Sequence, residues 1–273
     1  MSTWFITGCS TGFGRALAKA VIDRGFNAVI SARNVEAIAD LAASAPDRTL
    51  ALALDVTDHA KVVSAVQAAQ ERFGSIDVLI NNAGYGYRSA VEEGERETVE
   101  TMFATNFYGP VDLIQQVLPG MRERHSGVIV NMSSIAGRMS SPGSGFYSAT
   151  KFALEGLSDA LRQETAQHGI HVILVEPGPF RTDFAGRSMK RAAAISAYTS
   201  TVGERHKEDS RIDGNQPGDP AKAAEAIIAV ATAAKPPRRL LLGNRAIDRC
   251  KEELANQAAD IAAWEALGRR TDF

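Results

Sequence analysis

Short runs of apolar residues alternate with longer amphipathic segments along most of this chain. The apolar runs are not interrupted by polar residues at every second position, which predicts strands buried on both faces of a parallel sheet. The segments between them have helical periodicity, as expected for helices that cover both faces. We therefore expect a doubly wound α/β fold with about seven strands. The expected strands are residues 3–7, 27–32, 49–54, 77–82, 127–133, 171–176 and 239–243.

Domain organisation follows from the same pattern. The 273 residues contain no internal repeat, low-complexity linker or shift in composition, so we expect a single domain over residues 1–273. The periodicity weakens only at residues 183–218. A long segment without clear structure inside a compact domain is usually a lid or a mobile loop, and we expect a substrate loop there.

Composition argues against several other classes of protein. Lys and Arg number 30 against 32 Asp and Glu, a formal net charge of -2, which gives no sign of a nucleic-acid partner. No apolar run approaches the ~20 residues that span a bilayer, and the first residues do not resemble a signal peptide. Two cysteines are too few for a disulfide framework, and the five histidines form no metal-binding pattern. We expect a cytoplasmic protein without a membrane partner or a metal.

The first expected strand runs directly into TGCSTGFG, residues 7–14, and then into a helical segment. Gly8, Gly12 and Gly14 permit a tight turn and a close backbone approach, and the helix N-terminus offers free N–H groups to an anion. Between a first strand and a first helix, such a loop predicts a dinucleotide-binding site. Its simpler interpretation is a tight turn without a ligand.

The residues that end the second strand bear on the choice of cofactor. An acid there would bind the ribose 2′-OH of NAD, whereas an arginine would bind the 2′-phosphate of NADP. The sequence has Ser31, Ala32 and Arg33, with no acid before Glu36. This favours NADP(H), with NAD(H) as the other choice. Arg33 is alternatively a solvated surface residue.

Tyr147 and Lys151, in YSATK, lie four residues apart at the start of a helical segment. On a helix these positions share one face, so the ammonium can come near the phenol oxygen. Lowering the phenol pKa of about 10 by about three units requires ~4 kcal/mol, which one charge at ~4 Å supplies at an effective dielectric constant of ~20. Tyr147 would then act as an acid or base near neutral pH. The alternative is an amphipathic helix with a packed tyrosine and a solvated lysine.

In their order along the chain, these motifs resemble those of the classical short-chain dehydrogenase/reductase family. TGCSTGFG is similar to the family's TGxxxGxG, NNAG at residues 81–84 to its central-strand motif, and YSATK to its YxxxK. The resemblance covers most of residues 3–182 and implies a Rossmann fold with a nicotinamide cofactor. It also implies an oxidoreductase that acts on CH–OH groups, by hydride transfer between nicotinamide and a carbonyl or secondary alcohol.

The resemblance assigns the catalytic roles. It implies that Tyr147 is the acid/base, and that Lys151 binds the nicotinamide ribose and lowers the tyrosine pKa. Ser134, thirteen residues before Tyr147, would hydrogen-bond the substrate oxygen. Ser133 is adjacent, and only the family spacing selects between the two serines. Asn106, in TMFATNFYG, matches the asparagine of a proton relay to the lysine, with a capped or kinked helix position as its alternative.

The resemblance also assigns the cofactor contacts. Asp55 matches the acid at the adenine edge, and its alternative is a helix N-cap region. The PGxxxT segment that begins at Pro177 would meet the nicotinamide, and its alternative is a turn after a strand. Thr11 departs from the basic residue of other NADP-binding members. The implied contacts are Gly8, Ser10, Thr11, Gly12, Phe13, Gly14, Arg33, Asp55, Val56, Asn82, Ala83, Gly84, Tyr147, Lys151, Pro177, Gly178 and Thr182.

The substrate is expected to be lipophilic, because EPGPFRTDF and QPGDPAKA resemble segments of bacterial hydroxysteroid- or retinol-dehydrogenase-like members. Two other functions compete: a non-catalytic NADP(H)-sensing regulator, which commonly lacks the tyrosine and lysine, and an epimerase or dehydratase, which tends to carry TGxxGxxG. We also expect a homodimer or homotetramer through the helices at about residues 97–122 and 147–167. Candidates for an apolar pocket wall, or for ordinary packing, are Tyr85, Tyr87, Phe146, Phe184 and Met189.

Overall fold

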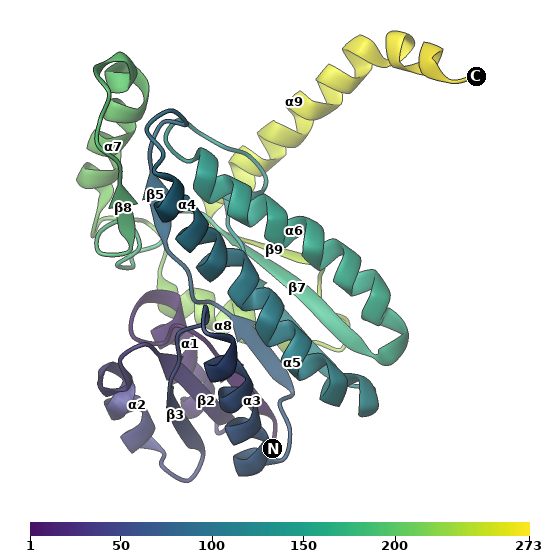
Figure 1. The fold of residues 1–273 in the computed structure, drawn as a ribbon. Coiled ribbons are helices and arrows are strands. Elements are labelled where there is room, and N and C mark those ends of the chain that lie inside the picture. The colour runs from purple at the N-terminus through teal and green to yellow at the C-terminus, as the bar shows by residue number, and fades with distance from the viewer.

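The computed structural model describes residues 1–273 and contains one parallel seven-stranded sheet with helices on both sides (Figure 1). The strand order is β3-β2-β1-β4-β6-β7-β9. The seven expected strands are all present, which confirms the doubly wound fold. Their bounds are β1 (Thr3–Ile6), β2 (Asn27–Ala32), β3 (Thr49–Ala53), β4 (Val78–Asn81), β6 (Gly127–Met132), β7 (Ile170–Pro177) and β9 (Arg239–Leu242).

Each face of the sheet has its own apolar core. In β1, Trp4 and Ile6 contribute to one core and Phe5 to the other, and all three are fully buried. Successive side chains of a strand point to opposite faces, so a strand covered on both sides is apolar throughout. One face is covered by α1 (Gly12–Asp23), α2 (Ala39–Ser44) and α8 (Pro220–Ala231), the other by α3 (His59–Phe73), α5 (Gly109–Glu123) and α6 (Gly145–Thr165).

The strand order reverses beside β1, which pairs with β2 on one side and with β4 on the other. In open α/β sheets, ligands bind in the crevice outside the carboxyl ends of the strands at such a reversal. The glycine loop follows β1 and the NNAG segment follows β4, so both open at this point. The sheet topology therefore gathers the sequence motifs at one edge.

A small second sheet lies beside this edge. In it β5 (Gly86–Arg88) pairs in parallel with β8 (Met189–Arg191), and α7 (Glu204–Ile212) follows (Figure 1). The segment 183–218 is thus more regular than its sequence pattern predicted. The three residues of β8 are too few for a periodic signal, and α7, ERHKEDSRI, has almost no apolar stripe.

Two further helices complete the chain. The helix α4 (Arg96–Phe103) leads through a π-helical turn at Ala104–Tyr108 into α5. The last helix, α9 (Asn244–Gly268), was not among the expected elements. It is attached beside β9 through the buried residues Ala246 and Cys250, and then projects away from the body (Figure 1).

We predict that Gly14→Ala destabilises the fold. A Cβ at Gly14 would lie 2.2 Å from the carbonyl oxygen of Gly8, so the loop between β1 and α1 must shift. The expected loss is about 1–3 kcal/mol of unfolding free energy, measured by denaturant titration. The control is Gly156→Ala on α6, where a Cβ meets nothing within 4 Å and a gain of about 0.5–1 kcal/mol is expected. Equal stability of the two variants would contradict the close approach.

Candidate active site

The loop after β1 forms a cradle at the N-terminus of α1. Gly8 has φ +71° and Gly12 has φ +58°, conformations that a side chain rarely permits. Thr11 is the N-cap residue but makes no side-chain cap hydrogen bond, and the first turn of α1 contains no acid. The first N–H groups and the positive end of the helix dipole are therefore available to an anion, as a dinucleotide pyrophosphate requires. Ser10 and Phe13 belong to the same loop.

Residues directly after β4 hold the glycine loop in place through hydrogen bonds. The Asn82 side-chain amide donates hydrogen bonds to the carbonyl oxygens of Thr7 at 2.8 Å and Gly8 at 3.1 Å. The Ala83 N–H donates to Thr7 Oγ1 at 3.0 Å. Asn82 thus positions the glycine loop with its side chain, a supporting role that its motif did not specify. The Gly84 backbone remains exposed in the crevice.

Asp55 lies just after β3, at the far edge strand of the sheet. Its side chain accepts two hydrogen bonds from Thr57, one from the backbone N–H at 3.0 Å and one from Oγ1 at 2.7 Å. The N-cap of α3 is Asp58, whose side chain accepts from the Lys61 N–H, so Asp55 does not serve as that cap. Val56 is buried against Gly109 of α5 and belongs to the core. Asp55 is therefore held in a turn near the carboxyl edge of the sheet.

Two arginines lie near the cradle, and they differ in their partners. Arg15 of α1 donates to the Ala37 carbonyl at 3.1 Å and forms an ion pair with Asp40. Arg33, directly after β2, is exposed and forms neither an ion pair nor a side-chain hydrogen bond. Arg33 is thus the arginine at the end of β2 that is free to meet a phosphate.

Tyr147 and Lys151 share one face of α6, and both are buried. The Ser134 hydroxyl lies close enough to the Tyr147 phenol to lower its pKa, and it accepts a hydrogen bond from the Ala136 N–H at 3.1 Å. Ser133 instead faces Gly137, where a Cβ would lie 2.7 Å from its Oγ. The structure therefore distinguishes two serines that only the family spacing had distinguished. Lys151 Nζ lies 5.8 Å from the centre of the Tyr147 ring and donates to the Met132 carbonyl at 2.8 Å.

Asn106 joins this group from the opposite side. It is fully buried in the π-helical turn between α4 and α5, its Oδ1 accepts from the Tyr85 N–H at 3.0 Å, and its Nδ2 donates to the Tyr85 carbonyl at 2.9 Å. A Cβ at Gly84 would lie 3.0 Å from Asn106 Oδ1 and 3.8 Å from Lys151 Nζ. A π-turn at this point is typical of a functional site.

The loop after β7 approaches the cradle from the other face. A Cβ at Gly12 would lie 3.4 Å from Thr182 Cβ, which places the PGxxxT segment beside the glycine loop. The Gly178 N–H donates to the Leu242 carbonyl at 3.0 Å, extending the pairing of β7 with β9 beyond Pro177. The structure thus brings Thr182 close to Gly12 and Gly84 close to Lys151, whereas Val56 lies in the core.

Burial shifts the pKa values of the pair in directions that the sequence did not predict. Burial raises the pKa of Tyr147 to about 12, against the lowering effects of the Ser134 hydrogen bond and the Arg88 charge. Burial also lowers the pKa of Lys151 to about 8, although the Glu155 carboxylate raises it. The expected depression of the tyrosine pKa by the lysine is therefore wrong, because burial outweighs the lowering effects and Lys151 is not among them. Spacing predicted the shared face but not the loss of solvation.

Sequence reasoning missed a buried ion pair that connects β5 to α7, within the expected lid segment. Arg88 Nε of β5 lies 2.7 Å from Asp209 Oδ2 of α7, and both side chains are almost fully buried. Arg88 Nη1 also donates a hydrogen bond to the Ser144 hydroxyl oxygen. Phe184 of the same lid segment packs with its ring centre 5.5 Å from that of Tyr147. A lone arginine in YRS carries no sequence signal for such a role.

A second unpredicted group is a pair of carboxylates behind Lys151. Arg239 Nε lies 3.1 Å from Glu155 Oε2 and 3.2 Å from Glu176 Oε1. Glu176 is fully buried. Burial, and then the charge of Glu155, raise the pKa of Glu176 to about 7, against the lowering effect of Arg138 and Arg239. The charge near Lys151 therefore depends on pH around neutrality.

Comparison with known proteins identifies the family. The short chain dehydrogenase family matches residues 2–193, and this chain belongs to it. The oxidoreductase BOA17 of Botryotinia fuckeliana is 38% identical over 265 residues, 97% of each protein. A 3-ketodihydrosphingosine reductase of Bacteroides thetaiotaomicron is 40% identical over 66% of this chain and 64% of its own length. The crystal structure of a short-chain dehydrogenase from Streptomyces avermitilis is 41% identical and covers 100% of both chains with a TM-score of 0.94.

Solved relatives also contain nicotinamide cofactors. A serine dehydrogenase complexed with NADP+ is 26% identical with a TM-score of 0.76, covering 88% of this chain and 94% of its own. A 3-ketoacyl-(acyl-carrier-protein) reductase of Brucella melitensis complexed with NADH has the same identity and a TM-score of 0.75, covering 90% and 98%. The chain is thus an oxidoreductase of a nicotinamide-dependent family. None of its helices is both long enough and apolar enough to span a bilayer.

We predict that Glu176 makes the fold less stable as pH rises. Its pKa is raised from 4.5 to about 7 in the folded protein, so its contribution is fully present below pH 4.5 and is lost as pH rises through 7. Glu176→Gln should flatten that part of the curve of melting temperature against pH. Glu252→Gln on the exposed surface of α9 is the control and should leave the curve unchanged. A wild-type slope in Glu176→Gln would contradict the raised pKa.

Proposed function

We propose that this protein is an NADP(H)-dependent oxidoreductase that interconverts a carbonyl and a secondary alcohol. The observation that carries the proposal is the placement of Tyr147 and Lys151 on one face of α6, with Ser134 beside the phenol, at the carboxyl edge of the sheet near the glycine cradle. When bound there, the nicotinamide supplies or accepts the hydride. The chain itself supplies an acid, a hydrogen-bond donor and a cation around one reacting oxygen.

The proton step falls to Tyr147. Its hydroxyl gives a proton to the oxygen of a carbonyl, or takes one from an alcohol, while the Ser134 hydroxyl holds the same oxygen. The raised pKa keeps the phenol protonated near neutral pH, which suits the donor role. Lys151, fixed by the Met132 carbonyl, is placed to hold the ribose, and the buried Asn106 shapes the route by which the proton is replaced.

The substrate is expected to be lipophilic. Tyr87, Met102 and Tyr147 form an apolar cluster, against which Phe146 and Phe184 pack, so the groups around the phenol are aromatic. The relative named for 3-ketodihydrosphingosine reduction matches two-thirds of this chain, and its name denotes a lipid ketone. The lid, residues 183–218, would close over such a substrate.

Two alternatives are less well supported. A regulator that only senses NADP(H) has no need of a buried tyrosine, serine and lysine around one point. An epimerase or dehydratase of the extended relatives is disfavoured by the TGxxxGxG spacing of the loop. Turnover separates these functions directly.

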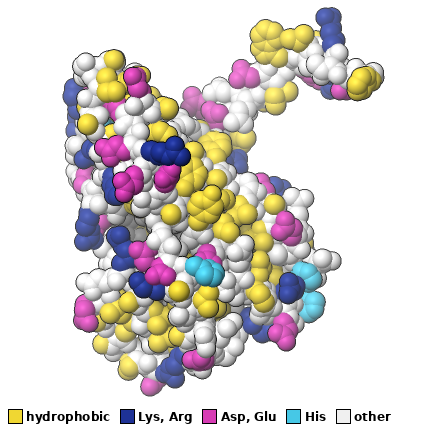
Figure 2. Space-filling model, viewed as in Figure 1, with side chains coloured by type: hydrophobic (Ala, Val, Ile, Leu, Met, Phe, Trp, Pro, Cys, Tyr) yellow, Lys and Arg dark blue, Asp and Glu magenta, His cyan; other side chains and the backbone are white.

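Location, domain organisation and assembly remain predictions. Two free, buried cysteines support a cytoplasmic protein, and a single main sheet supports one domain. Figure 2 shows hydrophobic side chains along the face of α5 and α6, and Tyr108, directly before α5, is exposed, which supports a homodimer or homotetramer through these helices.

We predict that Tyr147→Phe folds and binds cofactor but loses turnover by about 10³-fold or more, because the proton donor is gone. The assay is a panel of ketones, aldehydes and secondary alcohols, including long-chain ones, followed at the NADPH absorbance band. Tyr108→Phe, an exposed tyrosine, is the matched control. Retained turnover in Tyr147→Phe would reject the assignment. No turnover by the wild type with cofactor binding intact would favour the sensor.

We predict that Arg33→Ala weakens NADPH binding about 10- to 100-fold with little change for NADH, because only the 2′-phosphate needs the guanidinium. Fluorescence titration of both cofactors measures the difference. The control is Arg122→Ala, which replaces an exposed arginine in the last turn of α5. An equal loss for NADPH and NADH would mean that Arg33 does not read the phosphate.

A further inference from the structure

The helix α9 leaves the body of the protein after one and a half turns. It has 25 residues, of which only Ala246 and Cys250 are buried. Every residue from Leu254 to the end of the chain is exposed. Figure 2 shows hydrophobic side chains along this arm and at its tip. A helix without tertiary packing is only marginally stable in water, so we expect this arm to be stabilised by contact with another surface.

The arm carries an apolar stripe with the spacing of a coiled coil. Steps of three and four residues lead from Cys250 through Leu254, Gln257 and Ile261 to Trp264. Such steps define the seam by which two helices pack together. Leu254 is 50% exposed, and Ile261 and Trp264 are each 68% exposed. Apart from Cys250, which is buried, and Gln257, which is polar, the seam is apolar and exposed.

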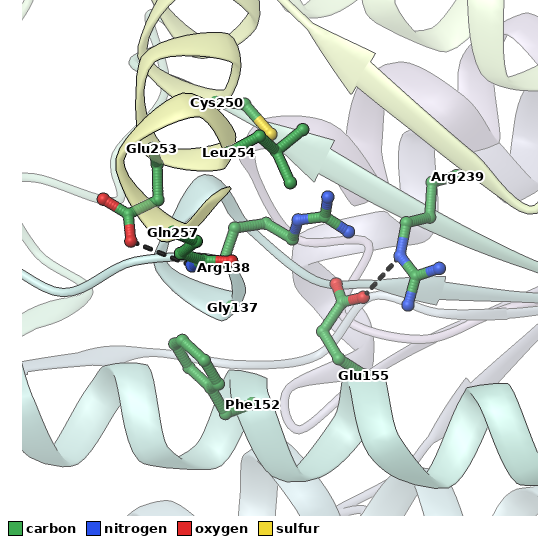
Figure 3. A pocket seen from close by; sticks show the side chains of 9 residues that line it. All are labelled: Gly137, Arg138, Phe152, Glu155, Arg239, Cys250, Glu253, Leu254 and Gln257. Carbon is green, nitrogen blue, oxygen red and sulfur yellow. Dashed lines mark hydrogen bonds and ion pairs between the residues drawn. The ribbon is translucent and has the colours of Figure 1, made fainter. Parts of the chain in front are cut away.

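The base of the arm contains a groove of about 200 Å³ between α9 and α6. Figure 3 shows Cys250 and Leu254 of α9 on one side of the Arg138 side chain, and Phe152 and Glu155 of α6 on the other. Phe152 is itself 48% exposed. The groove therefore offers a large side chain the apolar surfaces of Phe152 and Leu254 and the guanidinium of Arg138 at the point where the seam begins.

We propose that α9 pairs antiparallel with α9 of a second copy of this chain, around a two-fold axis level with Ala259. In this register Leu254 faces the partner's Trp264, and Gln257 faces the partner's Ile261. Each Trp264 then reaches the groove beside Phe152 on the partner subunit. One surface serves both copies, as a two-fold interface requires.

Charge favours this register. Lys251 and Glu265 flank the seam on the same side, and antiparallel pairing places each Lys251 opposite the partner's Glu265. Parallel pairing would instead place Asp260 beside the partner's Glu265, a contact between like charges. The antiparallel pair has two such attractive contacts and one like-charge contact between the two Asp260 side chains near the axis, whereas the parallel pair has two like-charge contacts.

The net charge of the arm also favours a protein over a lipid surface. Residues 244–273 contain five basic and six acidic residues. A helix that lies on a membrane usually has an excess of Lys and Arg on its polar face. The superposition with the Streptomyces avermitilis structure covers the full chain, so a helix in this place is not peculiar to this protein.

Cross-linking tests the register. In the proposed register, Ala258 flanks the seam and lies next to Ala258 of the partner subunit. Ala259 lies at the same level of the helix but on the side away from the partner subunit. Ala258→Cys should be cross-linked into a covalent dimer by a short bis-maleimide reagent, and Ala259→Cys should not. The native Cys9 and Cys250 are buried and set the background in the wild type. No preference for Ala258→Cys would overturn the proposal, as would a disulfide dimer of Ile261→Cys, which reports parallel pairing.

A charge exchange tests the contacts independently of any association through α5 and α6. In the Ala258→Cys background, Lys251→Glu should lower the cross-linking yield, reflecting roughly tenfold weaker pairing of α9. Adding Glu265→Lys should restore the yield. Failure of the double exchange to restore it would contradict the pairing of these two residues.

Fluorescence of the unaltered chain gives a third readout. Trp4 is fully buried and Trp264 is exposed, so quenching by acrylamide reports on Trp264. We expect Trp264 to be shielded from acrylamide at high protein concentration and to become accessible when the protein is diluted. Strong quenching at every concentration would overturn the proposal, and so would shielding that appears only with phosphatidylcholine–phosphatidylglycerol vesicles. None of these readouts depends on catalysis, so their failure leaves the proposed function intact.

Discussion

The burial of a phenol and an ammonium on one face of α6 is the constraint on which the site depends. Each group is more stable uncharged when it is removed from water, which raises the pKa of Tyr147 and lowers that of Lys151. Lys151 donates a hydrogen bond to the Met132 carbonyl, and Ser134 lies beside the Tyr147 phenol and lowers its pKa. Both partners follow from β6, so the site exists only because α6 lies across the carboxyl end of that strand.

The sheet makes this arrangement possible. Because both faces are buried in apolar cores, the polar residues of the motifs can gather only where the strands end. The reversal of strand order beside β1 opens a crevice there, and Asn82 fastens the glycine loop to the end of β4. Fold, cradle and acid/base pair are thus consequences of one parallel sheet.

The sequence predicted the parts of the protein that repeat a pattern. Strands buried on both sides are apolar throughout, so all seven were found, and ordered motifs placed Tyr147, Lys151 and the glycine loop at one edge. The sequence did not predict properties that depend on the three-dimensional surroundings of a residue. These include the direction of the pKa shifts, the Glu155 and Glu176 pair, and the bond between Arg88 and Asp209. The short β8 and the charged α7 lack the one-sided apolar pattern by which strands and helices are recognised.

The buried ion pair between Arg88 and Asp209 has a consequence for any movement of α7. A guanidinium separated from its carboxylate without water is costly, so α7 can move away from β5 only if water reaches both charged groups. We therefore expect solvation of this ion pair and displacement of α7 to occur together.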